Sequence, residues 1–141
     1  MPLSLDQRID AVSNELQSIG RLVAEDENAR KKVLGIVTKA VADFETPVET
    51  VWKMIMSPHA PSALMVLIRM GVVAKLAEAK QPMKAKDLAI VSGAAELLII
   101  RMMRPLVALG VFTETEPHTY TSTPISEVLT TPPLLGGYQF M

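Results

Sequence analysis

Residues 97–110 read LLIIRMMRPLVALG, and this run carries the strongest fold signal in the sequence. In a helix its apolar side chains cover most of the circumference, whereas an ordinary surface helix needs an apolar stripe only about 100° wide. The wide apolar face consists of Leu98, Ile99, Ile100, Met102, Met103, Leu106, Val107 and Leu109. The pattern predicts a long helix over residues 94–109, closed by Gly110 and buried against two partners.

The segments around this helix predict a helix-turn-helix with a small β-hairpin. A short helix over residues 84–91, with Leu88 and Ile90 inside, precedes the long one, and Gly93 lies in the turn between them. Two runs of β-prone residues at 111–115 and 119–122 follow, joined by a short polar link. This order is that of a winged helix, so the predicted fold class is mainly α with a small β-hairpin wing.

The N-terminal part predicts helices with an apolar seam. Apolar residues in the helix over 5–23 alternate at spacings of four and three, which is the a/d pattern of paired helices. The seam consists of Leu5, Ile9, Val12, Leu16, Ile19 and Val23. Asp26 can cap a second helix over 27–44, and Thr46 with Glu49 gives a capping box for a third. The first helix packs either on its own domain or on a second subunit, and both interpretations stay open.

Further segments predict apolar contacts. In the third helix, the side chains expected to face inward are Val48, Val51, Trp52 and Ile55. A helix over residues 61–70 is apolar on every side and must be buried all round, which is hard within one small subunit. Gly71 ends it, and a short helix over 72–79 follows. We therefore expect a homodimer. Its predicted interface consists of Leu5, Ile9, Val12, Leu16, Ile19, Val23, Trp52, Leu64, Leu67, Ile68, Ile99 and Met103.

Charge argues against a nucleic-acid partner. The formal net charge is −1, which gives no overall attraction to phosphate. A DNA-reading helix presents polar side chains near its N-terminus, but here that end is Ala94, Ala95 and Glu96. The predicted wing carries Glu114 and Glu116, which repel phosphate.

The composition also predicts a cytoplasmic protein with no membrane partner. The longest apolar run, residues 63–73, is interrupted by Arg69 and is too short to span a bilayer. The N-terminus contains Asp6 and Arg8 and lacks the apolar core of a signal peptide. The chain has no cysteine, which excludes disulfides and thiolate sites.

Motifs for catalysis or metal binding are absent from the sequence. The two histidines, His59 and His118, have no metal-ligand spacing, and neither a nucleophile elbow nor a glycine-rich dinucleotide loop occurs. His59 adjoins the most apolar helix and could line a pocket. Arg101 and Arg104 lie one turn apart, where pairing with local acids is the simpler interpretation and ligand binding the other. We predict no catalytic residue and no metal.

Several runs together resemble one known family. The stretch at 97–110, the entry segment at 45–52, the run at 68–73, the junction at 120–126 and the end at 136–141 occur in the family's order. They are similar to the N-terminal dimerisation domain, a winged-helix domain, of fungal and plant-type O-methyltransferases that use S-adenosylmethionine (SAM). The resemblance covers nearly the whole chain and rests mostly on structural motifs.

The resemblance implies a division of the chain and of its chemistry. Residues 1–58 correspond to dimerisation helices, 59–130 to the winged-helix-like domain, and 131–141 to the start of a connector to a missing catalytic domain. In the family two subunits interlock, and the N-terminal domain closes part of the substrate pocket. SAM and the general-base histidine belong to the catalytic domain. Only fifteen residues follow Ser126, so we expect no cofactor in this chain and no methyl transfer by it alone.

Three functions follow as hypotheses. The first is a dimerisation and substrate-lid domain of a fungal secondary-metabolite O-methyltransferase. The second is a stand-alone protein that catalyses or assists a SAM-independent cyclisation or rearrangement in polyketide-type biosynthesis. The third, weakened by the acidic wing, is a winged-helix DNA-binding regulator. The expected ligand is a small apolar, aromatic or polyketide-like molecule, with His59, Arg101, Phe140 and Met141 as possible pocket residues.

Overall fold

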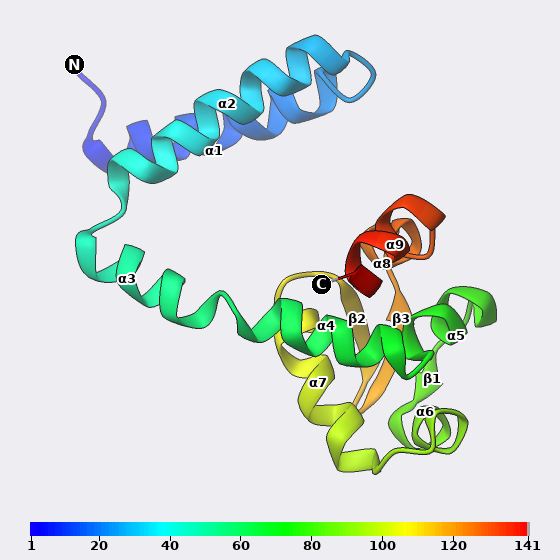
Figure 1. The fold of residues 1–141 in the computed structure, drawn as a ribbon. Coiled ribbons are helices and arrows are strands. Elements are labelled where there is room, and N and C mark those ends of the chain that lie inside the picture. Colours follow the sequence, from blue (N-terminus) through cyan, green and yellow to red (C-terminus); the bar gives the residue numbers. More distant parts are fainter. Residues whose placement is uncertain (141) are drawn as a thin grey trace. The chain divides into compact units, whose positions relative to one another are not determined.

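The structure is a computed structural model that describes residues 1–140, with Met141 outside the described part. The chain divides into two compact units, Met1–Thr50 and Val51–Met141. The helices are α1 (Leu5–Leu22), α2 (Glu27–Phe44), α3 (Pro47–Met56), α4 (His59–Arg69), α5 (Val72–Ala79), α6 (Ala85–Ser92), α7 (Glu96–Ala108), α8 (Pro124–Val128) and α9 (Pro132–Phe140). The strands are β1 (Met83–Lys84), β2 (Phe112–Glu116) and β3 (Thr119–Ser122) (Figure 1). The predicted boundaries at residues 58 and 130, which separate the dimerisation helices, the winged-helix-like domain and the connector, rest on the family resemblance and stay a prediction.

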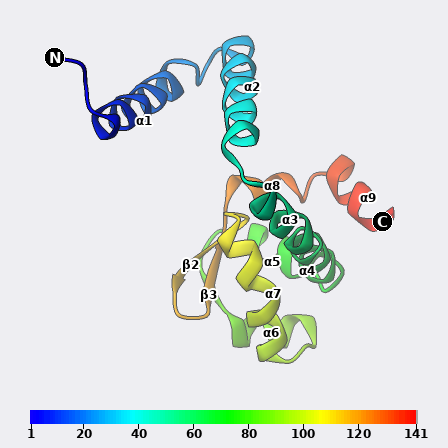
Figure 2. The same ribbon diagram turned by 90° about the vertical axis from the view of Figure 1, so that its left-hand side faces the viewer.

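The first unit contains two capped helices and no core of its own. Ser4 and Gln7 form a capping box at the start of α1, with Ser4 N–H donating to Gln7 Oε1 at 2.9 Å and Gln7 N–H donating to Ser4 Oγ at 3.2 Å. Asp26 caps α2 as predicted, accepting from Ala29 N–H at 3.0 Å. Figure 2 shows α1 and α2 as separate helices joined by a short connection. Within residues 1–50, all of which the structure describes, neither helix has a buried side chain. The seam of α1 is therefore exposed at Leu5, Ile9, Val12 and Leu16.

The start of α3 follows the predicted capping box. Thr46 N–H donates to Glu49 Oε2 at 2.8 Å, and Glu49 N–H donates to Thr46 Oγ1 at 3.4 Å. The hydrogen bonds from the Thr46 backbone and hydroxyl stabilise the carboxylate and lower the pKa of Glu49. The expected inward direction was wrong, because the side chains of Val48, Val51, Trp52 and Ile55 are all exposed in the single chain. A cap fixes where a helix begins but not what covers its apolar face.

The core of the second unit is built around α4 and α7, which pack against each other. Leu67, Ile99 and Met103 are each 0% exposed. Four side chains predicted to meet a second subunit are therefore corrected: Leu64, Leu67, Ile99 and Met103 are core residues of one subunit. Each of the two helices, α4 and α7, covers much of the apolar face of the other. No second copy of the chain is needed to bury these faces. Ile68 is half-buried against the same core.

The small sheet lies beside these helices with the strand order β1-β3-β2, all antiparallel. Its β2–β3 pair confirms the predicted hairpin, whereas the two-residue strand β1 was not predicted. Tyr120 on β3 is buried in the core, and this burial raises the pKa of its phenol, with the charge of Glu114 adding to the rise. On α6 Leu88 is buried as expected, whereas the expected burial of Ile90 was wrong, since Ile90 is 80% exposed and Ala89 is buried instead.

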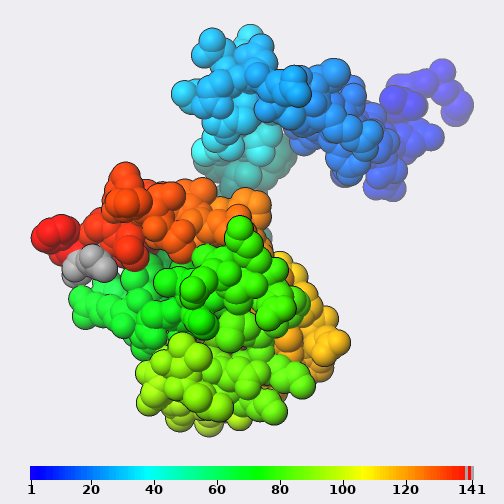
Figure 3. All heavy atoms as spheres, turned by 90° about the vertical axis from the view of Figure 1, so that its right-hand side faces the viewer, coloured from blue at the N-terminus to red at the C-terminus, as the bar shows by residue number. Residues whose placement is uncertain are grey.

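The C-terminal helices complete the second unit. Ser126 is 0% exposed and its hydroxyl closes the start of α8, accepting from Thr123 N–H at 2.9 Å and donating to the Thr123 carbonyl at 3.0 Å. Beyond a break, α9 forms and packs against α4 (Figure 3). The fold is mainly α with a small antiparallel sheet, which confirms the predicted class.

Within residues 1–140 no single helix is long and apolar enough to cross a membrane. One pair, Pro47–Arg69 with Val72–Ala79, passes the same test of length and composition only as a broken segment bent by 73°.

Candidate functional site

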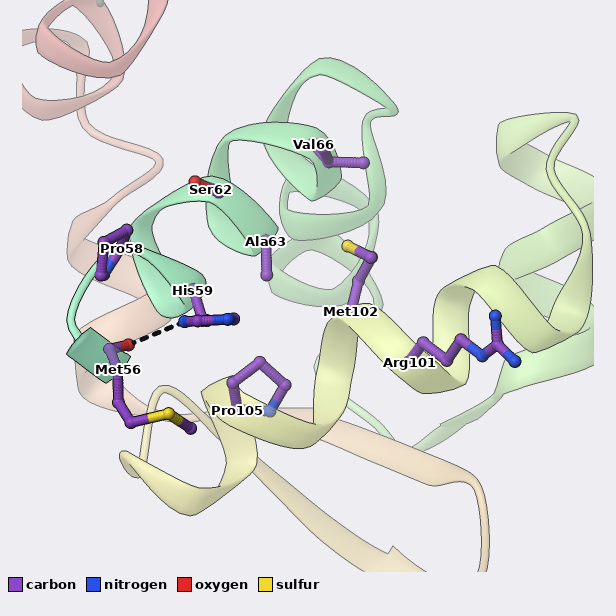
Figure 4. Close-up of a pocket in the computed structure, with 9 residues that line it drawn as sticks. All are labelled: Met56, Pro58, His59, Ser62, Ala63, Val66, Arg101, Met102 and Pro105. Atoms are coloured by element: carbon purple, nitrogen blue, oxygen red, sulfur yellow. Dashed lines mark hydrogen bonds between the residues drawn. The ribbon is translucent and has the colours of Figure 1, made fainter. Parts of the chain in front are cut away.

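A groove of about 610 Å³ opens between α4 and α7 in the second unit. Its lining residues are Met56, Pro58, His59, Ser62, Ala63, Val66, Arg101, Met102 and Pro105 (Figure 4). Most of these side chains are apolar. The groove is large enough for a small organic molecule, because ligand pockets typically measure about 300–1,000 Å³.

The turn between α3 and α4 sets the position of His59. Ser57 precedes Pro58, a position that disfavours helix and ends α3, so His59 begins α4. Its Nδ1 lies 3.2 Å from the carbonyl oxygen of Met56. A carbonyl can only accept, so Nδ1 carries the proton and, in the neutral ring, Nε2 is an acceptor. The histidine therefore offers one hydrogen-bond acceptor in an apolar setting.

Ser62 adds a second polar group on the same face of α4, because it follows His59 by three residues. Figure 4 shows His59 and Ala63 from α4 facing Pro105 from α7 across the groove. Pro105 has no N–H, so it cannot donate an α-helical hydrogen bond to the carbonyl of Arg101. Met102 forms part of the same wall, and its flexible thioether can adapt to ligands of different shape.

The structure brings two of the four predicted pocket residues together and leaves the others apart. His59 and Arg101 line the same groove. The guanidinium of Arg101 points away from His59, so this residue contributes its aliphatic stem to the wall (Figure 4). Phe140 is 95% exposed and does not line the groove, and Met141 lies outside the described residues.

Of the other predicted polar contacts, the ion pairs of the two arginines differ from the structure. In the described part of the chain, Arg101 and Arg104 form no ion pair, so the expected pairing with local acids is wrong. His118 lies at the hairpin tip, where its backbone N–H donates to Glu114 Oε1 at 2.7 Å. Among residues 1–140 no group of three His, Cys, Asp or Glu side chains could hold a metal ion. The groove can bind and orient a ligand, with His59 as its single imidazole.

Sequence reasoning missed several lining residues. The sequence analysis did not predict Met56, Ser62 or Met102 as lining residues. The groove arises from the tertiary contact between α4 and α7, which has no local sequence signal. One signal was present, since His59 and Ser62 are spaced to share a helical face beside an apolar run.

A second, smaller groove of about 390 Å³ lies between α8 and α9. It is lined by Pro124, Ile125, Val128, Leu129 and Leu134. None of these side chains carries a hydrogen-bonding or titratable group, so this groove has no feature that would orient a ligand.

The remaining interface residues fall into two groups. Leu5, Ile9, Val12, Leu16 and Trp52 are exposed in the single chain, whereas Ile19 and Val23 are half-buried within the first unit. Leu5, Ile9, Val12 and Leu16 share one face of α1, and exposed apolar faces of this kind are typical of interaction surfaces.

Comparison with known proteins agrees with these features. The sequence model of the O-methyltransferase dimerisation domain matches residues 52–132. The chain belongs to this family. The dimerisation domain is 29% identical over 112 residues to the 16-O-methyltransferase bsc6 of Alternaria brassicicola, a match that covers 79% of the chain and 28% of the relative. It is 30% identical over 115 residues to the O-methyltransferase penC of Penicillium thymicola, covering 82% of the chain and 29% of the relative. It therefore spans less than a third of the length of these relatives.

Solved structures share the fold of the dimerisation domain. A structure of LepI in complex with SAM superposes with a TM-score of 0.78 at 21% identity, covering 96% of this chain and 34% of the other. A structure described as a pericyclic reaction enzyme gives 0.78 at 21% identity, covering 94% and 34%. OxaC in complex with sinefungin and meleagrin gives 0.76 at 20% identity, covering 94% and 34%.

Proposed function

We propose that this dimerisation domain joins two copies of a fungal secondary-metabolite O-methyltransferase and forms part of the lid over the acceptor substrate. The observation that carries the proposal is the exposed apolar surface of the first three helices. Throughout residues 5–56 no side chain of α1, α2 or α3 is buried, although all three helices carry large apolar residues. Helices that expose so many large apolar side chains are rarely left in water by a soluble monomer. A second copy is the simplest cover for it.

Light scattering of the purified chain tests the proposal. We expect a mass of twice the 15.4 kDa monomer at micromolar concentration, decreasing toward the monomer on dilution. A well-folded protein that keeps the monomer mass at high micromolar concentration would contradict the proposal. Circular dichroism on the same sample establishes that the helices are formed.

The lid part of the proposal is supported by the groove between α4 and α7. Its apolar walls suit a flat aromatic or polyketide-like acceptor, and the free nitrogen of His59 suits a ligand hydroxyl. The sequence of the chain contains no glycine-rich motif for a nucleoside cofactor. We therefore propose that the domain helps to bind the acceptor and does not transfer methyl groups alone.

We expect 2-naphthol, a flat aromatic alcohol, to bind this groove. In NMR spectra of methionine-labelled protein, the methyl signals of Met56 and Met102 should shift on titration, while that of Met83, which is not in the lining, should not. His59→Phe keeps an aromatic ring but removes the acceptor. It should weaken 2-naphthol binding about two- to tenfold, the effect of one hydrogen bond.

Naphthalene is the matched control, because it lacks the hydroxyl and should bind wild type and His59→Phe with similar affinity. Equal loss for both compounds would argue against a hydrogen bond from the ligand to His59. Unchanged Met56 and Met102 signals would argue against the groove as the binding site.

A second candidate function is SAM-independent cyclisation or rearrangement of a polyketide-type intermediate. It is favoured by a feature that this chain supplies by itself, which is a single imidazole in an apolar groove. Such a site could hold a flexible substrate in a reactive conformation and act on one proton. The coding sequence downstream of Met141 discriminates the two functions. A frame that continues into βαβ units supports the methyltransferase, whereas a stop codon there supports the stand-alone protein.

A further inference from the structure

The seam of α1 is open over only part of its length. Leu5, Ile9, Val12 and Leu16 are 71%, 56%, 60% and 41% exposed. The seam residues that follow them, at 19 and 23, are half-buried within the first unit. Any partner of α1 must therefore cover a set of four side chains, two at a positions and two at d positions of the heptad.

We propose that α1 pairs in antiparallel orientation with α1 of a second copy. The pairing rests on the proposed function, since it assumes a dimer. In an antiparallel pair of helices each a residue faces a d residue. The four exposed positions are symmetric about the peptide bond between residues 10 and 11, so Leu5 lies opposite Leu16 of the second copy and Ile9 lies opposite its Val12. All four are covered without the half-buried end of the seam.

The charges beside the seam favour this orientation and register. Arg8 and Glu15 occupy the g positions, and both are exposed. In the antiparallel pair Arg8 of one copy faces Glu15 of the other, and symmetry repeats the ion pair. In a parallel pair Arg8 would face Ser13, and Glu15 would face Gly20, with no ion pair. Charges at e and g positions set the orientation of paired helices.

Shifting the antiparallel pair by one heptad removes this advantage. Glu15 would then face Glu15 of the second copy, and like charges placed opposite each other repel. The shifted pair would also need the side chains of Ile19 and Val23, which are half-buried within their own unit. The register centred between residues 10 and 11 satisfies the charges and the burial together.

The start of α1 has a local feature that favours pairing. Its capping box fixes the first turn, where Leu5 lies, so less conformational entropy is lost on association. The paired stretch is shorter than three heptads, and such short helices are marginal on their own. The α1 pair therefore adds to a larger dimer contact and fixes its geometry.

Engineered cysteines test the pairing without background, because the chain contains none. We would prepare Leu5→Cys and Leu16→Cys with tags of different length, unfold and refold them together, and oxidise under mild conditions. The mixture should give a cross-linked heterodimer on a non-reducing gel, whereas neither variant alone should cross-link. Asn14→Cys, on the outer face of α1, is the control and should not cross-link with either.

Each other outcome has a definite meaning. Self-cross-linking of Leu5→Cys would establish parallel pairing and overturn the proposal. Absence of the heterodimer, while light scattering still gives a dimer, would overturn the α1 pairing but leave the proposed function standing. A monomeric mass for the wild-type chain would overturn both.

Charge exchange provides a second measurement that needs no cysteine. Arg8→Glu places two acidic pairs across the interface and should weaken dimerisation about tenfold. The double variant Arg8→Glu/Glu15→Arg restores both ion pairs and should return the dissociation constant to within about twofold of wild type. Asp10→Lys changes charge on the outer face and should have little effect. Failure of the double variant to recover would contradict the antiparallel register.

Discussion

The chain carrying Ile9→Glu and Leu16→Glu is expected to be monomeric at concentrations where the wild-type chain is dimeric. Both side chains lie on the open face of α1, and a carboxylate there would lose its hydration on association without gaining a partner. The dissociation constant should rise by roughly a hundredfold or more. Sedimentation velocity or light scattering over a dilution series measures this change.

The matched control places the same two charges on the opposite face of the same helix. Asn14→Glu/Gln17→Glu alters the net charge equally and should leave the dissociation constant almost unchanged, since surface substitutions usually have small effects. If both double variants weaken the dimer equally, overall charge and not the apolar seam controls association. If neither weakens it, the interface lies elsewhere on the chain.

Leu67→Ala is expected to lower the free energy of unfolding of the second unit by about 2–5 kcal/mol. Leu67 is 0% exposed and lies in the core between α4 and α7, where its removal leaves a cavity that the surrounding helices cannot fill completely. The loss is a large fraction of the stability of a typical domain. Urea unfolding followed by circular dichroism gives the value.

Leu97→Ala is the control for the same chemical change at an exposed position. Leu97 lies on the outer face of α7, so its truncation should change the free energy of unfolding by less than about 0.5 kcal/mol. A small effect for Leu67→Ala, comparable with that of Leu97→Ala, would contradict the packing of α4 on α7. Both measurements should be made at one protein concentration, because dimerisation contributes to apparent stability.

Local signals in the sequence predicted most helix boundaries correctly. Asp26 and the pair of Thr46 and Glu49 cap their helices as expected, because a cap depends on hydrogen bonds within a few residues. The short helix after Gly71 also has its predicted bounds, and Gly71 adopts the left-handed conformation (φ 74°) that side chains avoid. β1 was missed because two residues carry no alternating pattern.

Burial was predicted less well because it depends on contacts between distant segments. Much of the wide apolar faces predicted for α4 and α7 is buried, as expected. The sequence does not tell whether the side chains that bury them come from the same chain or from a second copy. For Leu64 and Met103 the cover is the other helix of the same unit. Leu5 and Ile9 are not covered by other side chains of residues 1–50, so their contact with a second subunit stays a prediction. The groove was predicted in part, at His59 and Arg101, since its shape arises from packing.

Residues 1–50 bury no side chain in α1 or α2, and this affects how the chain behaves at low protein concentration. Two short helices without a shared interior have little to hold them in place when they are alone in water. The stability of α1 and α2 then depends on association with a partner surface, and therefore on the protein concentration. A cell that makes little of this chain would leave its leading segment open to proteases, while the remainder, with its sealed interior, persists.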